Sequence, residues 1–165
     1  MIKFCNRIYY NLYKFGLLID KLIFSPINNL FFKNKENRDE IIGAVRRVLE
    51  DKQRGTNITI AGVCFYGLVY LFLLGIINSI LILFKEIGIT ITINVHYKYL
   101  LLTLGIISYV CSYFIIDHKD KYLEYFDEFE MLAKDEKIKW GWISFVMIIL
   151  LFGFGFGSLL FRLTL

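Results

Sequence analysis

The sequence predicts an all-α membrane protein with three transmembrane helices, amino-terminal interfacial or amphipathic helices, and a possible short extracytoplasmic β-strand at 87–95. Three observations lead to this prediction. Of the 165 residues, 57% are hydrophobic and 21% are charged, whereas a soluble domain is about 45–50% apolar. The apolar residues gather in three uncharged runs, and Lys and Arg gather before the first run and between the second and the third. This composition excludes a disordered chain, a disulfide scaffold and an ordinary water-soluble enzyme.

Each uncharged run is long enough to cross a bilayer. A transmembrane helix needs about 20 mostly apolar residues to cross about 30 Å of hydrocarbon. Three stretches of 27, 18 and 19 residues lack Asp, Glu, Lys, Arg and His: 58–84, 99–116 and 143–161. We therefore predict a membrane domain at 56–165, with spans at 58–84, 97–117 and 141–161 and a cytoplasmic helical loop at 118–139.

The distribution of Lys and Arg predicts the orientation of these spans. Eleven precede the first span, two lie in the next loop, five lie in the loop after that, and Arg162 alone follows the third span. Cytoplasmic segments carry the excess of Lys and Arg in membrane proteins. A cytoplasmic amino terminus puts sixteen inside and three outside, and it leaves the carboxyl terminus outside. The net charge of +4 is therefore interpreted as a topology signal, and no nucleic-acid partner is expected.

Residues 1–55 form the predicted cytoplasmic arm, which begins with an apolar helix. Within residues 1–24 a polar, mostly basic stripe recurs at helical spacing: Lys3, Arg7, Asn11, Lys14 and Lys21. Such a stripe suits a helix that lies in the headgroup plane of a membrane. Packing of this helix on the spans is the alternative, and a cleaved signal peptide is not expected, because Asp20 and Lys21 interrupt its apolar core. A second, amphipathic helix is expected at about 38–54.

The loop at 118–139 carries an aromatic face at spacings of three and four, made of Tyr122, Tyr125, Phe126, Phe129 and Leu132. This pattern is typical of an amphipathic helix. We expect the second span to continue as one helix to about Ala133, and the charged segment 134–137 to turn the chain back toward the bilayer.

The loop after the first span alternates strictly between β-branched aliphatic residues and small or polar residues. The aliphatic positions are Ile87, Ile89, Ile91, Ile93 and Val95. A period of two favours a β-strand, but a single strand leaves its backbone groups unpaired. The segment is expected to lie extended on the outer membrane surface, to pair with another chain, or to continue the helices into a tight turn.

Two segments resemble parts of small uncharacterised bacterial multi-pass inner-membrane proteins. One is the aromatic run 122–130 with the following charged turn and 139–144, and the other is the aromatic stretch 8–15. The resemblance covers about a third of the chain. It implies a bacterial cytoplasmic (inner) membrane and no activity.

No phosphate loop, metal-ligand spacing or nucleophile motif is present in the sequence, so no cofactor, catalytic residue or metal site is expected. The one weak polar cluster, Asp117, His118 and Asp120, stands at the predicted inner end of the second span. These side chains are of a kind that could bind a metal or a lipid headgroup, but charged residues commonly gather where a helix leaves the membrane.

Small residues offer a route for helices to touch. Gly153 and Gly157 are four residues apart in the third span, and this spacing permits close approach of two helix backbones. The partner is either another span of the same chain or another membrane helix.

These observations favour a non-enzymatic integral membrane protein that binds another membrane protein, or a second copy of itself, in an accessory, assembly or immunity role. An oligomeric channel or transporter subunit is the alternative, although transporters usually carry an ionisable residue within a span. The third candidate is a membrane enzyme that acts on lipid headgroups. Besides a protein partner, the lipid bilayer is the expected surrounding.

Overall fold

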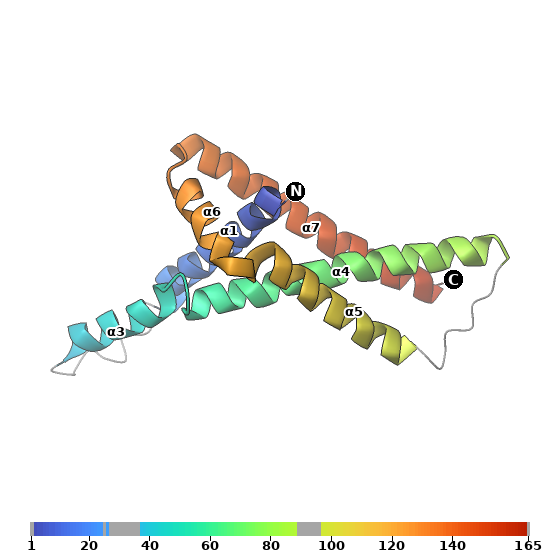
Figure 1. The fold of residues 1–165 in the computed structure, drawn as a ribbon, viewed down its shortest axis with the longest axis horizontal. Helices are drawn as coiled ribbons and strands as arrows, with labels where there is room; N and C mark the ends of the chain where they lie inside the picture. The colour runs from blue at the N-terminus through green and yellow to red at the C-terminus, as the bar shows by residue number, and fades with distance from the viewer. Residues whose placement is uncertain (1, 25, 27–36, 89–96, 165) are drawn as a thin grey trace. The chain divides into compact units, whose positions relative to one another are not determined.

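The computed structural model describes residues 2–24, 26, 37–88 and 97–164, and helices dominate these residues (Figure 1). The α-helices are α1 (Ile2–Ile19), α3 (Arg38–Glu50), α4 (Thr56–Glu86), α5 (Tyr97–Ser112), α6 (Lys121–Glu130) and α7 (Lys134–Thr164). A π-helical segment, Asp20–Phe24, extends α1, and a second one, Tyr113–Asp117, extends α5. The described residues contain no β-strand, which agrees with the predicted all-α class. Most of the proposed strand, residues 89–96, lies outside the described part of the chain.

Among the residues that the structure describes, three helical segments are long and apolar enough to cross a membrane: Thr56–Glu86, Lys98–Asp117 and Lys134–Phe161. They coincide with the three predicted spans. Only 22%, 22% and 11% of their most apolar windows are buried within the protein, so most of their apolar side chains face outward. Outward-facing apolar side chains are what a helix needs when lipid surrounds it.

The chain packs as two compact units. We call Met1–Phe65 with Asp120–Met131 the arm unit, and Tyr66–Lys119 with Leu132–Leu165 the span unit. This grouping differs from the predicted division at residue 55, because the first turns of α4 and all of α6 belong with the arm. Hydrophobic and helical periodicity do not predict that association, since α6 is far from the arm along the chain.

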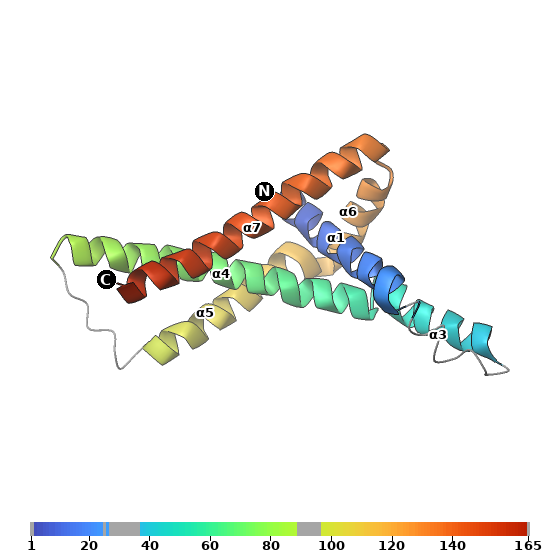
Figure 2. The same cartoon turned by 180° about the vertical axis from the view of Figure 1, so that it is seen from behind.

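In the arm unit, α1 and α6 lie side by side (Figures 1 and 2). The face of α1 that carries Tyr9, Tyr10 and Tyr13 is buried, as are Tyr122, Phe126 and Phe129 of α6. In the span unit, α4 approaches α7 where Leu71 and Gly75 meet Gly155 and Phe154, and it approaches α5 where the Tyr66 hydroxyl donates to the Gly105 carbonyl at 3.3 Å.

The prediction of one continuous helix from the second span to about Ala133 is wrong. The α-helix ends at Ser112, a π-helical turn follows, and a short 3₁₀ turn at His118–Asp120 separates it from α6. Asp120 has φ 53°, a left-handed conformation that stops a right-handed helix and that Asp adopts more readily than most residues.

The expected turn at 134–137 is also displaced. The chain turns at residues 131–133, and α7 already begins at Lys134. Asp135 and Glu136 lie in the first turn of α7, where negative charge is favoured by the helix dipole. The charged segment therefore starts the third long helix instead of forming the loop before it.

Candidate functional site

An aromatic cluster joins α1 and α6 in the arm unit. Phe126 is fully buried at its centre. Its ring centroid lies 5.0 Å from that of Tyr10 and 5.5 Å from those of Tyr9, Tyr13 and Tyr122. The pairs with Tyr10 and Tyr122 are edge-on, an arrangement that aromatic rings prefer, and the pairs with Tyr9 and Tyr13 are tilted. The cluster therefore holds α6 against α1, with the Phe126 ring at its centre.

Three tyrosine hydroxyls at the edge of this cluster reach the backbone at the end of α3, in the turn after it and in the first turn of α4. Tyr13 donates to the Glu50 carbonyl at 2.8 Å, Tyr122 to the Lys52 carbonyl at 3.1 Å and Tyr9 to the Ile58 carbonyl at 3.3 Å. Burial raises the pKa of Tyr13 above its ordinary value, so its hydroxyl stays protonated at neutral pH and remains a donor.

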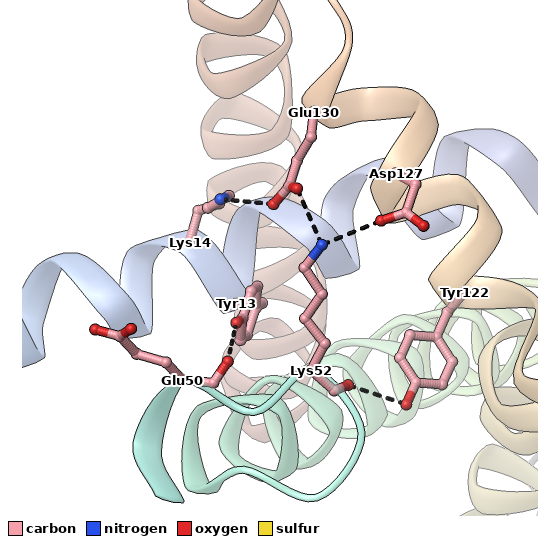
Figure 3. A network of polar contacts seen from close by, with 7 residues as sticks. All are labelled: Tyr13, Lys14, Glu50, Lys52, Tyr122, Asp127 and Glu130. Carbon is pink, nitrogen blue, oxygen red and sulfur yellow. Dashed lines mark hydrogen bonds and ion pairs between the residues drawn. The ribbon is translucent and has the colours of Figure 1, made fainter. Parts of the chain in front are cut away.

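Four charged side chains surround the same contact (Figure 3). The Glu130 carboxylate of α6 accepts hydrogen bonds from Lys14 Nζ of α1 at 3.0 Å and from Lys52 Nζ at 2.9 Å. Lys52 also donates to Asp127 at 3.1 Å. We call Lys14, Lys52, Asp127 and Glu130 the charge network. It joins α1, the turn after α3, and α6.

The pKa values of the charge network follow from these contacts. Burial by itself raises the pKa of Glu130, but hydrogen bonds from Lys52 and Lys14 outweigh it, and the pKa lies below its ordinary value. The hydrogen bond with Glu130 is the main reason that the pKa of Lys52 is raised. Burial lowers the pKa of Lys14, whereas its contacts with Glu130 and Tyr10 raise it, and the net shift is upward. All three groups are therefore charged at neutral pH.

The turn between α3 and α4 is shaped to present Lys52. The Asp51 carboxylate accepts from the backbone N–H groups of Gln53 and Arg54 at 2.7 and 3.4 Å. A Cβ at Gly55 would lie 2.3 Å from the Asp51 carbonyl oxygen, so the chain passes too close there for any other residue. This local geometry fixes where the Lys52 side chain leaves the backbone.

The charge network suits a structural contact between helices. Its charges are paired, and Glu130, Lys14 and Lys52 are stabilised in their charged forms, which is the opposite of what a general acid or base at neutral pH requires. Within the residues that the structure describes, no group of three or more His, Cys, Asp or Glu is placed to hold a metal ion.

The predicted polar cluster lies at the break between α5 and α6. Asp117 ends the π-helical turn, His118 begins the 3₁₀ turn, and Asp120 provides the left-handed residue. The His118 ring lies 5.7 Å from that of Phe114. The structure thus gives Asp120 a conformational role, and it shows no ligand geometry for the three residues.

The two predicted glycines of the third span lie away from the contact between α7 and α4. Nothing lies within 4 Å of a Cβ built on Gly153 or Gly157. The close approach occurs at Gly155, where a Cβ would lie 2.9 Å from the Leu71 carbonyl oxygen. Positions 153 and 155 point in nearly opposite directions on a helix of 3.6 residues per turn, so the Gly153 and Gly157 face is still available.

Of the four predicted isoleucine contacts, the structure describes one. Ile87 follows α4 in a turn and is 72% exposed, and the next residue, Gly88, has φ +84°. Ile89, Ile91 and Ile93 lie outside the described residues.

Sequence reasoning missed the charge network. It placed Lys14 in a polar, mostly basic stripe, but it did not pair this stripe with the acidic residues of the loop at 118–139. The available signal was the opposite charge of the two segments, with Lys3, Arg7 and Lys14 on one and Asp127, Glu128 and Glu130 on the other. No protein-family model, curated protein or solved structure matches the chain.

Proposed function

We propose that this chain is a non-enzymatic integral membrane protein that binds another membrane protein through its third span. The role is of an accessory, assembly or immunity type, in a bacterial inner membrane with the amino terminus in the cytoplasm. The excess of Lys and Arg on the proposed cytoplasmic side supports the orientation. The resemblance in the aromatic segments supports the bacterial setting.

The observation that carries the proposal is an exposed face of α7 with the spacing of a helix-packing seam. Its members are Val146, Leu150, Gly153, Gly157 and Leu160, at intervals of four, three, four and three. The three large side chains are 50%, 58% and 62% exposed, and the space over both glycines is open. This spacing matches the packing of one helix on another, and the glycines allow the partner's backbone to come close.

The polar groups within the spans give less support to a channel. The hydroxyls of Ser79, Thr103 and Ser108 donate to carbonyls four residues earlier in their own helices, at 2.8, 2.9 and 2.7 Å. A hydroxyl satisfied in this way can stay in an apolar surrounding. The alternating segment 87–96 remains a second proposed contact surface for a partner.

The proposal is tested by photo-crosslinking in native membranes. A benzophenone amino acid replaces Leu150, and the adducts are identified by mass spectrometry. We expect an adduct with an integral membrane protein, which Gly157→Ile removes because a branched side chain fills the space over the seam. Gly67→Ile is the matched control, since Gly67 lies in α4 and also has nothing within 4 Å of a built Cβ.

Retention of the adduct in Gly157→Ile would contradict the role of this face. Adducts with lipid alone would contradict protein binding by the third span. An adduct with a second copy of the chain would identify the partner as the protein itself.

A further inference from the structure

Contacts between α1 and α4 place α1 at the level where the first span begins. The Tyr9 hydroxyl bonds the Ile58 carbonyl at 3.3 Å, and the Tyr9 ring lies 6.2 Å from that of Phe65. Farther along α1, Asp20 accepts a hydrogen bond from the Asn57 side chain. Ile58 is the first residue of the uncharged run, and Phe65 is about 10 Å farther into it at 1.5 Å per residue. α1 therefore lies beside the membrane end of this span.

The basic residues of α1 are turned toward α6. Lys3 and Lys14 form ion pairs with Glu128 and Glu130, and the Arg7 guanidinium lies 5.1 Å from the centre of the Phe129 ring. The sequence suggested that this stripe reaches lipid headgroups. In the structure, these three cations instead have partners on α6.

Several large apolar side chains of α1 and of its π-helical extension are exposed, beside the exposed Lys21. Phe15, Leu18 and Leu22 are 60%, 53% and 66% exposed, and the neighbouring Ile23 is 51% exposed. Their spacings of three and four put them on one side of the helix. This side begins close to where Gly16 meets Asn57, since a Cβ on Gly16 would lie 2.9 Å from the Asn57 side-chain oxygen. The exposed apolar side is thus at the same level as the start of the span.

We propose that Phe15, Leu18 and Leu22 insert into the acyl-chain boundary of the leaflet that the first span enters. The occupant of this surface is lipid, because α1 is fixed beside a helix that lipid must surround at that level. Insertion is mainly apolar, because the Lys3, Arg7 and Lys14 cations are held by α6 and only Lys21 of the basic stripe is left exposed beside this surface. We therefore expect little dependence on anionic headgroups. This proposal is independent of what the third span binds.

Brominated-lipid quenching tests the depth of these residues in the full chain. In a Trp140→Phe, Trp142→Phe background, a single tryptophan is introduced as Phe15→Trp or Leu18→Trp, and the protein is reconstituted into phosphatidylcholine vesicles with brominated acyl chains. We expect loss of most of the fluorescence and protection from aqueous iodide. The loss should be equal in vesicles with and without phosphatidylglycerol. Glu124→Trp, on the exposed face of α6, is the control and should show the reverse.

Leu22→Cys in a chain without its three natural cysteines gives a second measurement. A nitroxide attached there should be relaxed by dissolved oxygen more than by an aqueous nickel complex. Iodide quenching at positions 15 and 18 would show that this side faces water. Protection from both quenchers would show that protein covers it. Quenching by bromine only with phosphatidylglycerol would show electrostatic binding. Each of these three results overturns the proposal.

Discussion

Phe126 gives the sharpest test of how the arm unit is held together. The side chain is fully buried and lies 5.0–5.5 Å, between ring centroids, from four tyrosines on two helices. Truncation of a buried Phe to Ala costs about 3–5 kcal/mol, because it removes apolar contacts and leaves a cavity. Since each 1.4 kcal/mol is a factor of ten, Phe126→Ala should raise the opening constant of α6 roughly a hundredfold to a few thousandfold.

Hydrogen exchange of the full chain in detergent micelles, measured on the amides of α6 by mass spectrometry, reports this opening constant. Phe15→Ala is the matched control on α1, because Phe15 is 60% exposed and a surface change of this kind costs about 0.5 kcal/mol or less. The amides of α7 should exchange as in the wild type in both variants, since α7 belongs to the span unit. If the α6 amides of Phe126→Ala stay within about threefold of the wild-type rate, less than 1 kcal/mol has been lost. The aromatic cluster would then not be what holds α6 to α1.

Three further changes test other contacts. Glu130→Gln should destabilise the arm unit by about 1 kcal/mol, because it weakens two partly exposed ion pairs. The pKa of Glu130 is lowered from an ordinary value of 4.5, so this stabilisation is complete above that value and is lost as pH falls through the lower folded pKa. The difference in Tm between wild type and variant in detergent should therefore disappear over that pH range. A difference that persists in acid would argue against the ion pairs. Gly155→Leu should lower the free energy of unfolding in dodecyl sulfate by about 1–3 kcal/mol, because the new Cβ meets the backbone of α4. Gly153→Leu should change it little. Equal effects of the two substitutions would contradict the observed contact. Asp120→Val should lower the Tm by straining a left-handed residue, at about 1–2 kcal/mol, while Asp120→Gly should not; a harmless Val would show that position 120 is not left-handed.

The contact between α1 and α6 shows how much helical periodicity can predict. The periodicity of the arm placed Lys3, Arg7 and Lys14 on one side of a helix, and the periodicity of the second loop placed Tyr122, Phe126 and Phe129 on one side of another. Both patterns recur in the structure. Periodicity shows which residues share a face, but it does not show which neighbour covers that face, so the cations were assigned to headgroups although Glu128 and Glu130 lie beside Lys3 and Lys14.

The sequence by itself determined the three long apolar helices and the aromatic face of α6, because uncharged length and helical period are properties of a continuous stretch of chain. Tertiary structure decided the rest. In the structure, α6 packs with the arm, and Gly155, not Gly153 or Gly157, contacts α4. Asp120 is left-handed at a position where a continuous helix was expected. Each of these depends on atoms brought together from distant parts of the chain, or on the direction in which the chain must leave a helix to reach them, and no local pattern of residues contains that information.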